Sequence, residues 1–301
     1  MTLSAAPATT VQVFTLTHFC GVTPRLFEGL LRRFGTIEAI FNSDRAAFLE
    51  VDGVKTQQAA ALAKAPKRLA EAEAMVRALA QREIQLLTRF DQDYSPLMIE
   101  LHDPPPLLYY RGHTPDLKKK TISVAGTRSA SAEGMELTSR LVRELVKHDI
   151  QIVSTLKGGI DLAVHLAAGT AGGVSFAVID RGVDQIGSGE TVPVAIDVVR
   201  KGGVISEYPP EKPSDSKTMT ETNRLVTGLA QAVVVTEFYN TSQRTLDLLR
   251  ACRDIGKLAF IMIDPKHGAL SDENALGQAH ECGAIPMEGF ERIDDIVKAL
   301  V

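Results

Sequence analysis

Short apolar runs recur through the second half of the chain, and helical stretches separate them. The runs cover residues 121–125, 151–155, 174–179, 203–206, 232–236 and 258–263. Most positions in these runs are apolar, which is typical of strands that are buried on both faces of a sheet. The intervening helices supply the cover on each face. The pattern therefore predicts an α/β domain over residues 121–301, built on a Rossmann-like, doubly wound and mostly parallel sheet.

Residues 1–84 follow a helical period instead. Apolar side chains recur every three to four positions, for example at Leu26 and Leu30. Residues 48–59 have the form of a helix, a glycine turn and a second helix, as in SAM or helix-hairpin-helix-like modules, whose turn amides can contact a DNA phosphate. Lys55 stands where such modules usually place a second glycine. We favour a structural helical domain, with a DNA-gripping hairpin as the alternative.

Residues 85–120 change to short strands and turns. Three consecutive prolines at positions 104–106 exclude a helix there. We interpret this segment as a connector that adds edge strands to the sheet of the following domain.

Composition and charge narrow the class of protein. The chain has 301 residues, of which 45% are hydrophobic and 23% are charged, as in ordinary globular proteins. It lacks a long apolar stretch and a secretory start, so we expect a cytoplasmic protein with no membrane partner. The three cysteines form no C-x-x-C pair, which predicts buried free thiols and no zinc or other cofactor. The formal net charge is −4, so any site for an anion must be local.

The loop after residue 125 is the first candidate site. Ligands of doubly wound sheets bind in the crevice at the carboxyl ends of the strands. Gly126 allows close backbone approach, Thr127 offers a hydroxyl, and Arg128 offers a planar fork for phosphate. Ser131 is placed to cap the next helix, whose positive end favours anions. We favour a phosphate or nucleotide contact over a plain capped turn.

The loop after residue 155 is the second candidate. Gly158 and Gly159 expose backbone amides, and Lys157 adds a positive charge, which together suit a phosphate. Asp161 is expected at the N-cap of the next helix, with His165 one turn later. The pair could perform acid–base chemistry, but a cap and a packed histidine are the favoured interpretation.

Two further segments carry polar and basic side chains. After residue 236, Ser242 or Thr245 is placed to cap a helix, and Arg244 could bind an anion. After residue 206, Asn223 and Arg224 could reach bases or phosphates. In both segments a structural role has equal support.

Taken together and in order, these segments resemble the DNA-processing protein A family, also called DprA or Smf. The matching segments are residues 90–96, 103–112, 126–134, 159–165, 206–210, 223–229 and Glu237. The sequence departs from the family pattern at Gly158, where the family usually has a basic residue, so that Lys157 carries the charge one position earlier. Thr222 stands where the family has an arginine, and residues 242–245 replace a Ser-Gly-Ser type of loop.

The resemblance implies a function as well as a fold. Members bind single-stranded DNA in a basic pocket, protect incoming DNA and load a RecA-type recombinase during natural transformation, and they form dimers. It implies that Arg128, Lys157, Asn223 and Arg224 line the pocket. We expect Asp161, His165 and Glu237 to have structural roles at this site.

We therefore expect a non-enzymatic recombination mediator with no catalytic residue. The alternative is a nucleotide-binding sensor or a nucleotide-processing enzyme on the same fold. The related phosphoribohydrolases use a Gly-Gly-x-Gly-Thr-x-x-Glu loop, and the corresponding residues 241–248 lack its glycines and its glutamate, which disfavours the enzyme.

Overall fold

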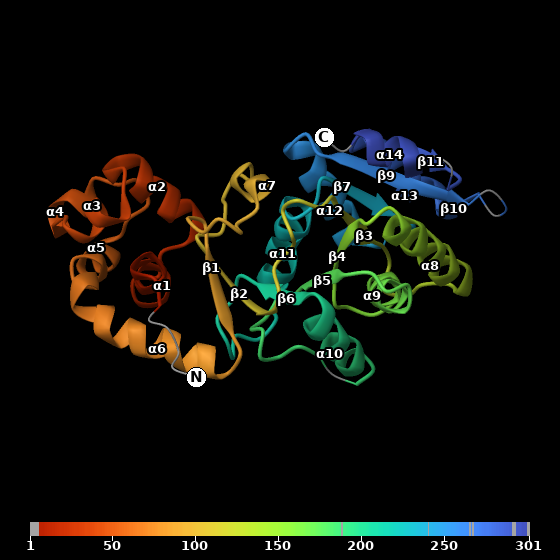
Figure 1. Cartoon of the computed structure of the whole chain (residues 1–301). Coiled ribbons are helices and arrows are strands. Elements are labelled where there is room, and N and C mark those ends of the chain that lie inside the picture. The colour runs from red at the N-terminus through yellow and green to blue at the C-terminus, as the bar shows by residue number, and fades with distance from the viewer. Residues whose placement is uncertain are drawn as a thin grey trace. The chain divides into compact units, whose positions relative to one another are not determined.

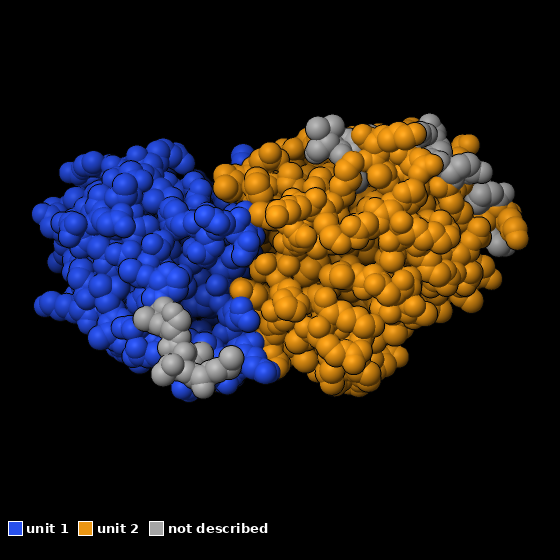
Figure 2. Space-filling view, viewed as in Figure 1, with its two compact units in different colours: residues 1–94, 102–109 blue, residues 95–101, 110–301 orange. Residues whose placement is uncertain are grey.

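The chain forms two compact units (Figure 2). The computed structural model describes residues 6–187, 189–239, 241–264, 266, 268–290 and 293–299. Unit 1 comprises residues 1–94 and 102–109, and unit 2 comprises residues 95–101 and 110–301. The chain passes between the units after Tyr94, after Leu101 and after Tyr109. The domain boundaries predicted at residues 84 and 120 stay predictions.

Unit 1 is mainly helical, as the period of its sequence predicts. Its elements are α1 (Ala8–Cys20), α2 (Pro24–Phe34), α3 (Ile37–Phe41), α4 (Arg45–Leu49), α5 (Thr56–Leu62), the 3-10 helix η1 (Ala65–Arg68), α6 (Leu69–Gln81) and β1 (Gln85–Thr88). Large side chains such as Phe14, Phe27 and Phe48 are completely buried and form its core. Helices α4 and α5 pack together across a turn in which Gly53 has a φ of 82°, so the predicted helix–turn–helix is confirmed.

Unit 2 alternates strands and helices (Figure 1). Strand β2 (Leu107–Gly112) begins in unit 1 and ends in unit 2, where α7 (Pro96–Ile99) also lies. The strands that follow are β3 (Thr121–Ala125), β4 (Gln151–Thr155), β5 (Ser175–Val178), β6 (Gly203–Ser206), β7 (Ala232–Val235), β8 (Glu237–Phe238), β9 (Leu258–Asp264), β10 (Gly268–Ser271) and β11 (Ile285–Glu288). The helices are α8 (Ala132–Lys147), α9 (Ile160–Thr170), α10 (Thr191–Lys201), α11 (Ser216–Gly228), α12 (Gln243–Asp254), α13 (Glu273–Glu281) and α14 (Ile293–Ala299).

The central strands of unit 2 run in the order β6-β5-β4-β3-β7-β9, and each neighbouring pair is parallel. Strand β11 extends the sheet in parallel along β9, whereas β10 pairs antiparallel with β9 and parallel with β8. The predicted α/β class with a mostly parallel, doubly wound sheet is confirmed.

Helices cover both faces of this sheet. On one face, α8, α9 and α14 pack with alternate strand residues such as Ile122, Ile152 and Val234 in one buried apolar cluster. Helices α11 and α12 pack against each other and also contact strands of the sheet. The sheet is therefore buried on both sides, which leaves the loops at the strand ends as its accessible parts.

The described residues include no helix that is both long and apolar enough to cross a membrane. Cys20, Cys252 and Cys282 are all buried and unpaired, as the spacing of the cysteines predicts.

Candidate functional site

Three loops meet at the carboxyl ends of the central strands. Strand β3 lies between β4 and β7, and because all three are parallel, the loops that follow them emerge side by side. The loops are also hydrogen-bonded to one another. The backbone N–H of Thr127 donates to the carbonyl of Glu237 at 2.8 Å, and that of Ile160 donates to the carbonyl of Thr127 at 3.0 Å. These loops are therefore joined in one backbone frame, and we call this edge of the sheet the crevice because ligands of doubly wound sheets bind there.

Glu237 anchors the first loop. Its buried carboxylate accepts hydrogen bonds from the backbone N–H of Ser131, at 3.0 and 3.2 Å, and from the hydroxyl of Tyr239. Ser131 in turn caps α8, because its hydroxyl accepts from the N–H of Gly134 at 2.9 Å, as the sequence predicts. A Cβ at Gly134 would lie 1.9 Å from a carboxylate oxygen of Glu237, so this position has room only for glycine.

Arg128 is the exposed cation of the first loop. Among the described residues, no carboxylate forms an ion pair with it, so its guanidinium is open to an external anion. Lys157 differs. Its ammonium lies 2.8 Å from a carboxylate oxygen of Asp180, and the two side chains are only 8% and 1% exposed.

The Lys157–Asp180 pair is held in a polar but closed environment. Burial lowers the pKa of Lys157, and its hydrogen bond to Asp180 opposes this effect. Burial by itself would raise the pKa of Asp180, but the contact with Lys157 and the hydroxyl of Ser214, 2.8 Å away, hold that pKa below its usual value. The charge of Lys157 is thus neutralised inside the protein.

Asp161 does not cap α9, so this prediction is wrong. The N-cap is Gly159, with a φ of 69°, and Asp161 lies in the first turn. A Cβ at Gly159 would come within 2.3 Å of the carbonyl oxygen of Arg128, so glycine lets the two loops approach and starts the helix earlier. The buried carboxylate of Asp161 binds Arg244 instead, at 2.9 Å, and accepts from the hydroxyl of Thr155.

His165 is packed beneath the loops. Its Nε2 lies 3.0 Å from the carbonyl oxygen of Thr155, so this nitrogen donates, and its Nδ1 lies 2.9 Å from the hydroxyl of Ser175 and accepts. Burial lowers the pKa of His165 to about 4, so the ring is neutral at physiological pH. The described contacts include no hydrogen bond between His165 and Asp161, and the ring supports the backbone of β4.

The remaining predicted residues are also held by protein partners. The amide of Asn223 is buried and donates to the carbonyl of Arg244 at 3.2 Å. The guanidinium of Arg224 binds both carboxylate oxygens of Glu207.

The predicted capping of α12 by Ser242 or Thr245 is wrong. Ser242 stands at the N-cap position, but its hydroxyl accepts from the N–H of Tyr239 at 3.2 Å. The hydroxyl of Thr245 donates to the carbonyl of Gly126 at 3.3 Å. Both side chains therefore fasten loops to one another and leave the helix start uncapped by a side chain.

The sequence interpretation missed the carboxylates of this site. Asp180 and Glu207 neutralise Lys157 and Arg224, and Arg181 stands beside Asp180 at 3.5 Å. A signal was present, because Asp180 and Arg181 directly follow the strand expected at 174–179. Within the described residues, no group of three or more His, Cys, Asp or Glu side chains could hold a metal ion.

Sequence comparison gives a clear result. Residues 85–299 match the family described as DNA recombination-mediator protein A. The chain is 28% identical over 221 residues to Protein Smf from Synechocystis sp.. This aligned region covers 72% of this chain and 55% of that protein. It is 32% identical over 173 residues to the DNA processing protein DprA from Streptococcus pneumoniae, covering 58% of this chain and 61% of that protein. The chain thus spans a little over half the length of these curated relatives.

Solved structures show the same fold. The DNA processing protein A structure from Streptococcus pneumoniae has a TM-score of 0.72 at 21% identity, covering 94% of this chain and 95% of that chain. The DNA processing protein A structure from Helicobacter pylori has a TM-score of 0.61 at 21% identity, covering 73% of this chain and 98% of that chain.

Proposed function

The chain belongs to the DNA recombination-mediator protein A family, and from this premise we propose that it binds single-stranded DNA in the crevice of unit 2 and delivers a RecA-type recombinase to that strand. The family is one of recombination mediators and not of enzymes, so we assign no catalytic residue. The DNA processing protein A from Helicobacter pylori has a single-stranded DNA binding mode, which supports the same ligand here. The setting that we propose is the protection and recombination of incoming DNA in natural transformation.

One observation carries the proposal: Arg128 presents a guanidinium that no described carboxylate pairs with, on a loop that backbone hydrogen bonds join to its neighbours. A guanidinium without an internal partner can form a bidentate contact with a phosphate without first breaking an ion pair. Lys157, Arg224 and Arg244 are the other predicted cations, but each already binds a carboxylate. A phosphate must compete with those carboxylates, so Arg128 supplies the principal contact.

Modest binding by one chain favours action in pairs. The net charge is −4, and among the described cations that we predict for the crevice only Arg128 has no ion pair, so we expect a single chain to bind a long polyanion weakly. A homodimer would place two crevices on one strand, and the second would bind at high effective concentration, which can raise the avidity about a hundredfold. Sedimentation with and without DNA tests this, and a species of 32.5 kDa under both conditions would rule out the dimer.

The DNA proposal is tested by fluorescence anisotropy with labelled single-stranded DNA, duplex DNA and free nucleotides at two salt concentrations. We expect tightest binding to single-stranded DNA, with Arg128→Ala weakening it by about 1 to 3 kcal/mol. The matched control is Arg143→Ala, which removes an exposed arginine from α8, about 18 Å along the helix from Ser131. Equal losses in the two variants would contradict the site, and preference for a free nucleotide would support the sensor alternative.

Recombinase delivery needs its own assay. We expect the chain to shorten the lag before a RecA-type recombinase forms filaments on single-stranded DNA. Arg128→Ala should lengthen the lag again, because delivery depends on holding the strand. A lag that the chain leaves unchanged would remove this part of the proposal while leaving DNA binding intact.

A further inference from the structure

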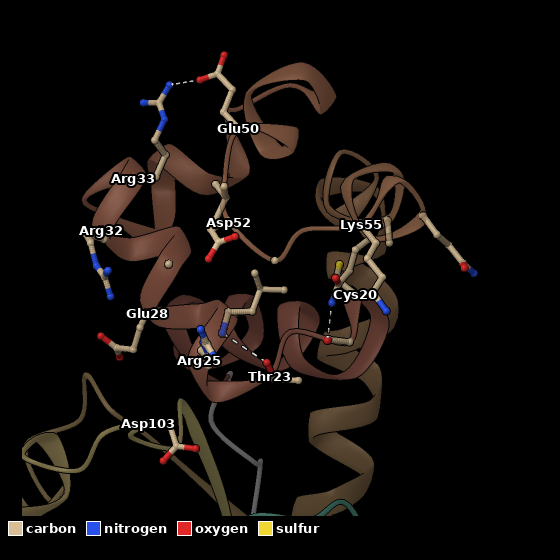
Figure 3. A pocket seen from close by; sticks show the side chains of 18 of the residues that line it. Cys20, Thr23, Arg25, Glu28, Arg32, Arg33, Glu50, Asp52, Lys55 and Asp103 are labelled. Atoms are coloured by element: carbon tan, nitrogen blue, oxygen red, sulfur yellow. Dashed lines mark hydrogen bonds and ion pairs between the residues drawn. The ribbon is translucent and has the colours of Figure 1, made fainter.

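Unit 1 contains a groove of about 1690 Å³ that the proposed function does not use. Its walls are the end of α1, the outer face of α2, the turn between α4 and α5, and the start of α5 (Figure 3). Phe19, Leu26 and Val51 give the lining an apolar component. The turn is the one that the sequence marks as helix-hairpin-helix-like, with Lys55 in place of a second glycine.

The ionic contacts leave this groove with an excess of positive charge. Four carboxylates line it, at Glu28, Glu50, Asp52 and Asp103. Glu28 forms an ion pair with Arg89, Glu50 forms one with Arg33 at 2.6 Å, and Asp103 also has a partner. Asp52 differs, because no described residue forms an ion pair or a side-chain hydrogen bond with it.

The cations of the lining are arranged differently. Arg25, Arg32 and Lys55 are exposed, and no described carboxylate pairs with any of them. Figure 3 shows Arg32 and Lys55 on different walls, with Asp52 between them. The unpaired side chains therefore carry three positive charges against one negative charge.

The backbone holds these walls in place. Gly29 of α2 lets the turn approach closely, since a Cβ there would lie 3.3 Å from Val51. The side chain of Gln58 donates to the carbonyl of Gly21 at 2.9 Å and so fastens α5 to the end of α1. The cations thus project from a folded frame and need little ordering of the backbone when they bind.

We propose that this groove is a second DNA contact, in which Arg25, Arg32 and Lys55 bind successive phosphates of one sugar–phosphate backbone. A single phosphate cannot reach cations on separate walls, whereas a polymer with regularly spaced anions can, and sugars can cover the apolar part of the lining. Asp52 opposes this binding and tunes its strength. The proposal rests on the proposed function for the identity of the polyanion, but it does not depend on the crevice of unit 2.

The test uses the full chain and four variants of it. They are the double variant Arg32→Ala/Lys55→Ala, Asp52→Asn, Arg128→Ala, and the double variant combined with Arg128→Ala. Affinity for labelled single-stranded and duplex DNA is measured over a range of salt. Losing two phosphate contacts should reduce the slope of log K against log salt by about 1.4 on a single strand or about 1.8 on a duplex. Asp52→Asn should bind more tightly than the unaltered protein. Arg45→Ala removes an exposed arginine of the same unit from outside the groove lining and should leave the slope unchanged by comparison.

The outcomes separate this site from the crevice. A reduced slope for Arg32→Ala/Lys55→Ala in both the unaltered and the Arg128→Ala backgrounds supports the groove, even if Arg128→Ala alone has no effect. Slopes equal to that of Arg45→Ala in both DNA forms, together with no gain for Asp52→Asn, would overturn it. Photo-crosslinking of bromouracil-substituted DNA to the peptide that contains Lys55 gives an independent readout, and crosslinks confined to unit 2 would also overturn it.

Discussion

The buried pair of Lys157 and Asp180 makes a quantitative prediction about stability. Replacing Lys157 by methionine keeps the side chain's length and removes its charge, which leaves the carboxyl group of Asp180, only 1% exposed, without its lysine partner. Removing one partner of a buried ion pair costs about 3 to 5 kcal/mol, because the remaining charge is uncompensated. Ser214 still donates to Asp180 and Arg181 stays 3.5 Å from it, so we expect the lower end of this range, about 3 kcal/mol. The midpoint of thermal unfolding should fall by about 10 °C.

Urea unfolding, followed by circular dichroism, measures this loss. Lys157→Met/Asp180→Leu should recover most of it, because an apolar pair can replace a buried ion pair at little cost. The matched control is Lys201→Met, whose ion pair with Asp197 spans a similar 3.0 Å but is 38% and 34% exposed. That variant should lose less than about 1 kcal/mol. If Lys157→Met loses no more than Lys201→Met, the assignment of Lys157 to an internal pair is wrong.

Three further predictions follow from individual positions. A Cβ at Gly158 would meet nothing within 4 Å, so Gly158→Arg should fold normally. The added cation should steepen the slope of log K against log salt for single-stranded DNA by about 0.7, and an unchanged slope would count against the crevice. Because burial lowers the pKa of His165 from 6.5 to about 4, the unfolded chain binds that proton more readily between these pH values. The free energy of unfolding should therefore be fully retained above pH 6.5 and fall by about 3 kcal/mol towards pH 4, and His165→Gln should remove most of that decline in denaturation measured across this range. Gly134→Ala should destabilise the protein by about 1 to 3 kcal/mol, because the added methyl group clashes with Glu237. The control is Gly277→Ala on α13, where the methyl group meets nothing within 4 Å. Equal melting temperatures of the two variants would refute the clash.

The sequence predicts the central sheet well because its strands are short, mostly apolar runs that helical segments separate. The segments expected at 121–125, 151–155 and 203–206 coincide with β3, β4 and β6. The short strands β8, β10 and β11 were missed. Strand β10 is partly exposed and β11 contains Pro286, so neither has the pattern of a buried strand, and both depend on pairing with β9 or β8.

The candidate site was predicted less completely than the fold. Local patterns locate the cations and the cap at Ser131, because loops and caps involve neighbours in sequence. The partners of those cations come from distant positions: Asp161 and Arg244 are separated by 83 residues. The residues of one loop do not show which carboxylate from a distant loop will pair with its cations in the folded chain. For this reason the sequence predicts more cations available to an external anion than the folded chain leaves unpaired.

The path of the chain between its two units limits how this protein can be rearranged in evolution. Since residues 102–109 return to unit 1 after residues 95–101 have joined unit 2, no single breakpoint separates the units cleanly. A gene fusion that exchanges everything before position 95 would keep residues 102–109, which belong to the replaced unit 1. A fusion that exchanges everything before position 110 would also replace residues 95–101, which belong to unit 2. Successful chimaeras between relatives should therefore carry matched replacements on both sides of the return.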